Sequence, residues 1–116
     1  MAWTLEFKPS AERDLGGILD HLFRAYRDFG ETTESAFDSA DARVAQIRQE
    51  ARRLIVGPYR GDRHEEILPG LRHLTMGRAV YWFEVDGATK RVTVPAIFFG
   101  AQDYHRKMIS RLTTGD

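Results

Sequence analysis

The sequence predicts an α+β fold in which a helical hairpin packs against an antiparallel sheet. Residues 70–100 contain three runs rich in β-branched and aromatic side chains, separated by Gly77-Arg78 and by a turn that begins at Asp86-Gly87. Residues 10–57 instead carry apolar side chains three or four positions apart, the spacing of one helix face. The expected order is an N-terminal strand, an antiparallel helical hairpin, a three-stranded antiparallel meander and a short C-terminal helix. We expect residues 1–116 to form a single domain.

The first strand and the first helix meet at Pro9-Ser10. Trp3, Leu5 and Phe7 alternate with polar residues, which predicts a short strand that joins the meander as its fourth strand. Ser10 is a good N-cap for the helix that follows. Asp28 to Gly30 ends this helix, whose apolar stripe is expected to consist of Leu15, Ile18, Leu19, Leu22, Phe23 and Tyr26.

The second helix begins at Thr32 or Thr33 and ends at Gly57-Pro58. Because only a few residues connect the two helices, they are expected to lie antiparallel. Both apolar stripes are expected to pack into the core. The second stripe comprises Phe37, Ala40, Val44, Ile47, Ala51, Leu54 and Ile55.

The register of the meander follows from a two-residue type II′ turn at Gly77-Arg78 and a four-residue loop over Asp86–Thr89. This register places Glu84 opposite Arg91. The predicted core face contains Leu74, Met76, Ala79, Tyr81, Phe83, Val85, Val92, Val94, Ala96 and Phe98. The opposite face is mixed and is expected to meet water or a partner; it contains His73, Thr75, Val80, Trp82, Glu84, Arg91, Thr93, Pro95, Ile97 and Phe99.

Two further segments complete the chain. The linker over residues 58–70 lacks periodicity, so its charged side chains are expected to be solvated, with a site rim beside the sheet as the alternative; they are Arg60, Arg63, His64, Glu65 and Glu66. Asp103 can cap a last helix. Its apolar side would be Tyr104, Met108, Ile109 and Leu112, and its basic side His105, Arg106, Lys107 and Arg111.

Composition excludes several classes of function. The chain has no cysteine, its four histidines lack zinc-motif spacing, and it has no glycine-rich phosphate loop, so we expect no metal and no cofactor. Gly16-Gly17 lies within a helix, where it is expected to permit close packing. No apolar run is long enough for a signal peptide or a membrane span, which favours a cytoplasmic protein.

Charge is distributed unevenly along the chain. The net charge is +0, but residues 1–50 hold 6 Lys/Arg against 10 Asp/Glu, whereas residues 51–116 hold 11 against 7. The sheet half is therefore basic, which suits a nucleic-acid or acidic-protein partner, although scattered surface charge would give the same total.

The order of elements, together with four short motifs, resembles the RelE/ParE superfamily of bacterial toxins. The motifs are the helical SAERDLGGILDHL, Gly70-Leu71-Arg72, the block RAVYWFEVDG over 78–87, and VPAIFFGAQD ending at Asp103. The resemblance covers nearly the whole chain. It implies a small growth-inhibiting toxin that is neutralised by a cognate antitoxin in a toxin–antitoxin hetero-oligomer.

The superfamily contains ribosome-dependent mRNA endonucleases similar to RelE and YoeB, and ParE-like proteins that poison DNA gyrase without a nuclease site. This chain has no lysine between Lys8 and Lys90, so the lysine cluster of RelE-like enzymes is missing. A YoeB-like catalytic set could still be assembled from Arg78, Glu84, Tyr104 and His105.

The long helical hairpin and the G-A-Q-D ending favour the ParE-like branch, in which no catalytic residue is needed. Family members with that ending often carry a histidine where Phe99 stands here, which removes one candidate base. A degenerate member that only binds its antitoxin is a third alternative. For the favoured branch, the residues expected to contact the target are Arg72, Arg78, Trp82, Arg91 and Arg106.

Overall fold

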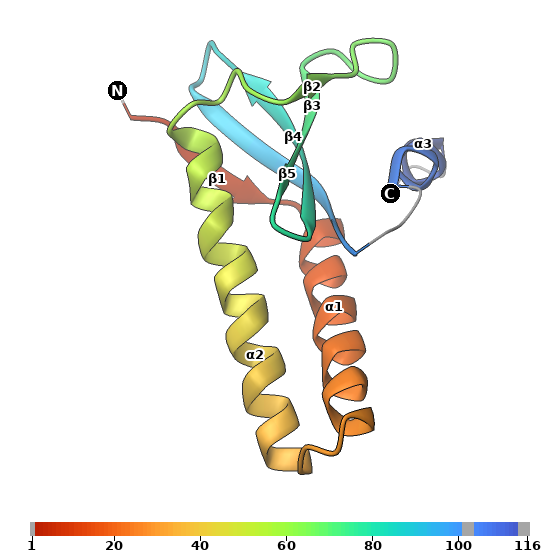
Figure 1. Ribbon diagram of the computed structural model, residues 1–116. Coiled ribbons are helices and arrows are strands. Elements are labelled where there is room, and N and C mark those ends of the chain that lie inside the picture. The colour runs from red at the N-terminus through yellow and green to blue at the C-terminus, as the bar shows by residue number, and fades with distance from the viewer. Residues whose placement is uncertain (1, 101–103, 114–116) are drawn as a thin grey trace.

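The computed structural model describes residues 2–100 and 104–113 and has the predicted α+β architecture (Figure 1). Five strands form one sheet in the order β1-β5-β4-β3-β2. Their bounds are β1 Thr4–Phe7, β2 Asp62–Arg63, β3 Leu71–Met76, β4 Ala79–Asp86 and β5 Arg91–Phe99. The helices are α1 Pro9–Asp28, α2 Thr33–Glu50, the 3₁₀ helix η1 Ala51–Ile55, and α3 Tyr104–Thr113. Strand β1 is parallel to β5, and the other pairings are antiparallel.

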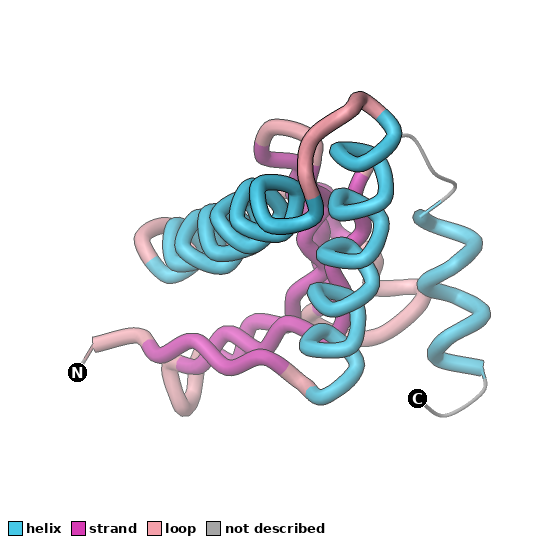
Figure 2. Tube along the Cα trace, turned by 90° about the horizontal axis from the view of Figure 1, so that it is seen from below, coloured by secondary structure: helices cyan, strands magenta, loops and turns pink. Residues whose placement is uncertain are grey.

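The molecule has three layers, because helices cover both faces of the sheet (Figure 2). The α1–α2 hairpin covers one face, and its far end extends beyond the sheet (Figure 1). Phe37 lies one turn from that end and is 49% exposed, so the prediction that it packs in the core is wrong. The hairpin contributes Ala11, Leu15, Ile18, Leu22, Ala40 and Ile47 to the main core, together with Ala51 and Leu54 of η1.

The observed start of α2 agrees with the sequence prediction, whereas the start of α1 differs from it. The Thr32 hydroxyl accepts a hydrogen bond from the Ser35 N–H at 3.1 Å, so Thr32 is the expected N-cap of α2. Helix α1 instead begins at Pro9 with Lys8 at the N-cap position. The Ser10 hydroxyl is buried and donates to the Pro95 carbonyl at 2.6 Å, so it ties α1 to β5 rather than capping the helix.

A β-bulge in β5 changes the predicted core face. Trp82 lies opposite Ala96 and Glu84 opposite Thr93, so both Val94 and Pro95 lie opposite Phe83. Proline cannot donate to a ladder and is tolerated at such bulges. Alternation shifts by one residue there: Ile97 and Phe99 face the helical hairpin, and Ala96 and Phe98 face α3, the reverse of the prediction. The other predicted core-face residues do pack on the hairpin side.

The two meander turns differ in how well the sequence predicts them. Gly77 has φ 63° and joins Met76 to Ala79, which confirms the two-residue turn. The second turn covers residues 87–90, one position later than expected, and Asp86 pairs with Arg91. The Asp86 carboxylate accepts from the Ala88 N–H at 3.0 Å and so stabilises this turn. Glu84 is therefore not opposite Arg91, and that prediction is wrong.

The linker before β3 is more ordered than the sequence suggests. Gly61, with φ 84°, lets the chain pass close to the His73 carbonyl, and β2 then pairs with β3 through Asp62↔His73 and Arg63↔Arg72. The side chain of His64 is only 12% exposed, so it is not solvated as predicted. The other charged linker residues, Arg60, Arg63, Glu65 and Glu66, are exposed as expected.

Helix α3 lies on the sheet face that was expected to meet water or a partner. Met108 is fully buried against Leu71, Val80, Trp82 and Phe98. Ile109 is 45% exposed, although it was assigned to the apolar side, and Arg111 is partly buried in an ion pair rather than solvated. The predicted cap Asp103 lies outside the described residues, as do the side chains of Tyr104 and His105.

Gly16 and Gly17 do not serve close helix packing. A Cβ atom at either position would meet no atom within 4 Å, and both residues are exposed. The described part of the chain contains no helix with the length and apolar character needed to cross a membrane.

Candidate functional site

A YoeB-like nuclease centre would require Arg78 and Glu84 to act on one phosphate, and β4 holds them apart. Arg78 lies in the turn before β4, whereas Glu84 lies near the far end of that strand. Six residues of extended strand span about 20 Å. The Glu84 carboxylate forms an ion pair with the Lys8 ammonium at 3.4 Å instead. The side chains of the other two members of the set, Tyr104 and His105, lie outside the described residues.

The centre of the sheet face beneath α3 is apolar. Trp82 is fully buried there, and Met108 of α3 covers it. The remaining buried residues of this cluster are Leu71, Val80, Ala96 and Phe98. Transphosphorylation of RNA needs a base, an acid and cations at the phosphate. The six apolar side chains of this cluster supply none of those groups.

The predicted target-binding arginines on the sheet lie in different places. Arg78 is exposed at the β3–β4 turn, whereas Arg91 lies at the opposite end of β4 and β5, with its guanidinium 3.7 Å from the Glu6 carboxylate. The Arg72 guanidinium is 5.5 Å from the centroid of the Tyr59 ring. Arg78 and Arg91 therefore cannot belong to one compact contact.

The two other predicted target-binding residues lie on or under α3. Arg106 is exposed on α3, where it lines a cleft against α1. Trp82 is 0% exposed, so in this conformation it offers no surface to a target, contrary to the exposure that its assignment as a target contact requires. The register predicted from the two turns assigned Trp82 to the correct sheet face but could not reveal the helix that covers it.

A pair of histidines, which the sequence did not bring together, packs against Trp82. His64 Nε2 and His73 Nδ1 are 2.6 Å apart, and the two rings stack with their centroids 4.8 Å apart. Asp62 lies 3.5 Å from His73 Nε2, and Glu66 lies 3.6 Å from His64 Nδ1. The two imidazoles therefore form one hydrogen-bonded pair, with an exposed carboxylate near the outer nitrogen of each ring. No sequence signal indicated it, because it depends on the two-residue strand β2.

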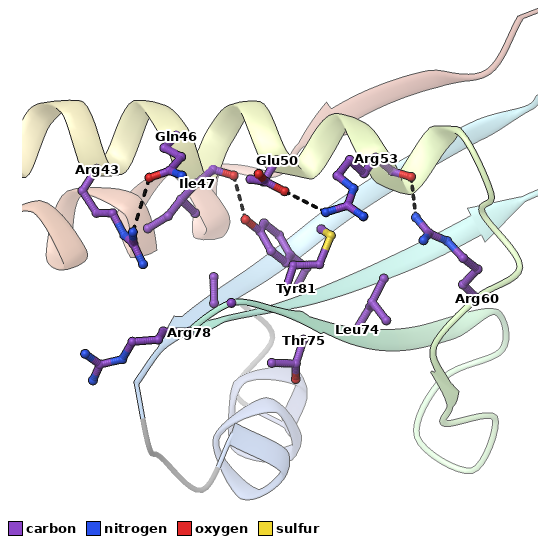
Figure 3. A pocket seen from close by; sticks show the side chains of 13 residues that line it. Arg43, Gln46, Ile47, Glu50, Arg53, Arg60, Leu74, Thr75, Arg78 and Tyr81 are labelled. Carbon is purple, nitrogen blue, oxygen red and sulfur yellow. Dashed lines mark hydrogen bonds and ion pairs between the residues drawn. The ribbon is translucent and has the colours of Figure 1, made fainter.

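The arginine cleft, a hollow of about 430 Å³, separates α2 from the β3–β4 hairpin (Figure 3). Its rim carries Arg43, Arg53, Arg60 and Arg78. The other residues that line it are Gln46, Ile47, Glu50, Leu74, Thr75, Met76, Gly77, Ala79 and Tyr81. Of the rim, the sequence singled out Arg78 as functional and treated Arg60 as a solvated linker residue.

Tyr81 closes the bottom of the arginine cleft. Its hydroxyl donates a hydrogen bond to the Ile47 carbonyl at 2.8 Å and so ties β4 to α2. Burial raises the pKa of the Tyr81 hydroxyl well above its ordinary value, and the negative charge of Glu50 adds to this shift. The hydroxyl is thus a structural donor and does not ionise near neutral pH. Within residues 2–100 and 104–113, no group of three or more His, Asp or Glu side chains could hold a metal ion.

The fold is similar to that of several solved structures. A chain of the chromosomal ParDE TA system from P. aeruginosa matches with a TM-score of 0.65 and 22% identity, covering 85% of this chain and 97% of that chain. A chain of the toxin–antitoxin complex RelBE2 from Mycobacterium tuberculosis matches with a TM-score of 0.56 and 16% identity, covering 85% and 99%. The isolated E. coli RelE toxin matches with a TM-score of 0.50 and 10% identity, covering 96% and 99%.

No protein-family model and no curated protein matches the sequence. The likeness therefore rests on the arrangement of the elements: the parallel β1–β5 pair, the helical hairpin on one face and the antiparallel β3–β4–β5 meander. The chain has the fold of the RelE/ParE toxins.

Proposed function

We propose that this chain is the toxin of a type II toxin–antitoxin pair and acts as a ParE-like inhibitor of DNA gyrase. The shared fold supports the toxin class. The separation of Arg78 from Glu84 along β4 carries the choice of branch, because a nuclease would need its charged groups at one phosphate. The buried apolar layer under α3 supports the same choice. A protein that inhibits its target by surface binding needs no nuclease centre, so it is compatible with both features.

The proposed target contacts are the exposed or partly exposed arginines Arg72, Arg78, Arg91 and Arg106. Arginine is enriched among residues that dominate protein interfaces. Arg78 is the first of these to test, since a hairpin tip can enter a partner without displacing other elements. The protein would act in the cytoplasm, where gyrase and DNA are found, and a cognate antitoxin would neutralise it.

The experiment that tests this function is controlled expression of the chain, with growth, plasmid supercoiling and mRNA cleavage on ribosomes measured in parallel. We expect growth arrest with inhibited supercoiling and intact mRNA. His105→Gln is expected to leave toxicity nearly unchanged. If this variant loses toxicity by about 10²–10⁴ without a change in melting temperature, and mRNA cleavage disappears with it, the protein is a ribonuclease instead.

The partner can be tested separately from the target. The adjacent gene is expected to encode a DNA-binding domain with an acidic amphipathic tail. A ligand at one hundred times its dissociation constant stabilises the folded state by about 2.7 kcal/mol. A melting temperature that does not respond to a saturating amount of this gene product would remove it as the antitoxin.

A further inference from the structure

Two guanidinium groups at one end of the arginine cleft have no carboxylate partner among the described residues. Arg43 from α2 and Arg78 from the β3–β4 turn lie at the same end (Figure 3). Their Cζ atoms are 5.6 and 5.4 Å from the centroid of the Phe99 ring. Arg43 donates a hydrogen bond to the amide oxygen of Gln46 at 3.3 Å. Two like charges held near one ring repel each other, and an anion bound beside them would reduce that repulsion.

The opposite end of the cleft is also basic. The Arg60 guanidinium is oriented by the Gly57 carbonyl at 2.9 Å and the Arg53 carbonyl at 2.6 Å, which do not neutralise its charge. Arg53 forms an ion pair with Glu50 at 3.2 Å. The rim therefore holds four arginines and one glutamate, with positive charge at both ends. This distribution suits an elongated ligand with several negative charges.

The floor of the cleft is apolar and partly open. Leu74 and Met76 pack against the helical core but remain partly exposed in the cleft, beside the buried Ala79. The volume of about 430 Å³ is enough for several side chains. Aliphatic groups of a ligand would remove this apolar surface from water. A nucleic-acid backbone offers negative charge but no aliphatic side chain for this floor.

The edge of β3 beside the cleft can supply main-chain hydrogen bonds. Strand β2 pairs only with Arg72 and His73. In the part of the chain that the structure describes, no strand pairs with residues 74–76 on that side. An exposed strand edge is a template for an extended peptide. The edge, the apolar floor and the charged rim thus favour the same chemical class of ligand.

We propose that the arginine cleft docks an extended acidic segment of a partner protein. Carboxylates of the segment pair with Arg43 and Arg78 at one end, and an aliphatic side chain covers Leu74 and Met76. The identification of this partner as the antitoxin rests on the proposed function, whereas the chemistry of the cleft does not.

The test uses the whole chain and three labelled probes: a ten-residue peptide of alternating Glu and Leu, the same peptide with Lys for Glu, and a single-stranded ten-nucleotide oligothymidylate. Fluorescence anisotropy measures the affinities at several salt concentrations. We expect the Glu–Leu peptide to bind more tightly than either other probe. Amide chemical shifts are expected to change on the facing parts of α2 and β3 and at the β3–β4 turn.

Matched charge reversals locate the site. Arg43→Glu and Arg78→Glu are each expected to weaken binding of the Glu–Leu peptide at least tenfold, while Arg24→Glu on an exposed position of α1 is expected to change it less than twofold. The double reversal should gain affinity for the Lys–Leu peptide. Thermal melting of each variant confirms that it is folded, and Met76→Ala should weaken binding without changing its salt dependence.

Two results would overturn the docking site: equal affinity of the Glu–Leu peptide for the parent chain and both folded charge-reversal variants, or tighter binding of the oligothymidylate that both reversals abolish. The second result would make the cleft a nucleic-acid groove. If the peptide binds in the cleft but expression of the chain does not arrest growth, the docking site stands and the proposed toxin function fails. If the adjacent gene product relieves arrest and binds both charge-reversal variants unchanged, the function stands and the site fails.

Discussion

The Asp14 carboxylate of α1 and the Arg111 guanidinium of α3 form a bidentate ion pair, with both N–O distances at 2.8 Å. The same carboxylate accepts the Ile97 N–H at 2.9 Å, and Arg111 also donates to the Pro95 carbonyl at 3.2 Å. The side chains are 13% and 18% exposed. The pair joins α1, α3 and the bulged part of β5, and it holds α3 over the apolar sheet face.

Asp14→Ala is expected to lower the free energy of unfolding by about 1.5–3 kcal/mol, because Arg111 and the Ile97 N–H lose a charged acceptor. Urea unfolding measures the change, and faster amide exchange in α3 would locate it. Asp20→Ala, at an exposed position of the same helix, is the matched control and should stay within about 0.5 kcal/mol. If the amide exchange rates of α3 are the same in Asp14→Ala and in the parent chain, the apolar contacts alone hold this helix.

Two glycine substitutions should act in opposite directions. Gly16→Ala is expected to stabilise the protein by about 1 kcal/mol, since the position is helical, exposed and free of contacts. Gly61→Ala should destabilise it by more than about 1 kcal/mol, because φ is 84° and the new Cβ would clash with the His73 carbonyl oxygen. Denaturant midpoints compare the two variants. A stable Gly61→Ala protein would contradict the close approach of β2 to β3.

Ile47→Ala should lower the free energy of unfolding by about 2–5 kcal/mol, because Ile47 is 4% exposed and its truncation leaves a cavity in the core. Phe37→Ala serves as its counterpart on the same helix. Because the Phe37 side chain is 49% exposed, Phe37→Ala should lower the free energy of unfolding much less, by about 0.5 kcal/mol. Comparable losses at the two positions, measured by chemical denaturation, would show that the far end of the hairpin is buried in solution.

His73→Phe is expected to cost about 1 kcal/mol, because it keeps an aromatic ring against Trp82 but removes the hydrogen bond to His64. His73→Ala should cost more, since it also removes the ring. In a Trp3→Phe background the remaining tryptophan, Trp82, reports its own environment by fluorescence. A red shift is expected for His73→Ala and not for His73→Phe; identical spectra for both would indicate that the histidine does not shield the indole.

The ion pair between Glu12 and Arg48 should stabilise the helical hairpin only above acidic pH. The Arg48 guanidinium donates to the Glu12 carboxylate at 2.6 and 3.0 Å and lowers the pKa of that carboxyl. A lowered pKa in the folded state gives a stabilisation that is complete above the unfolded pKa of about 4.3 and disappears as the pH falls below it.

Both side chains of that pair are about half exposed, 47% for Glu12 and 45% for Arg48, so the effect should remain below about 1 kcal/mol. Glu12→Gln is expected to be less stable than the parent chain at pH 7 and equally stable at pH 3 in urea titrations. Added salt should narrow the difference at pH 7. If the stability difference between Glu12→Gln and the parent chain is the same at pH 3 and pH 7, the loss comes from packing and not from the ion pair.

Much of the fold can be read from local pattern. Apolar spacing predicts the α1–α2 hairpin and most of its inner face, although α2 ends at Glu50 and continues as η1 instead of reaching Gly57 as one helix. Gly77 predicts the tight turn that sets the β3–β4 register. These predictions succeed because each depends on a few adjacent residues and on the period of a helix or strand. The apolar composition of the meander likewise predicts that the sheet face beneath the hairpin is buried.

The candidate sites follow less directly. The sequence singled out Arg78 as a turn residue, but Arg43, 35 positions earlier, reaches the same ring only because α2 crosses the β3–β4 hairpin. His64 and His73 meet because a two-residue strand pairs with β3, and so short a strand has no periodicity to detect. The sequence alone determined the α+β class, the helical hairpin and the faces of β4. Only the tertiary structure decided the bulge opposite Phe83, the burial of Trp82 beneath α3 and the arginine cleft, because each depends on contacts between segments whose separation along the chain leaves no local signal.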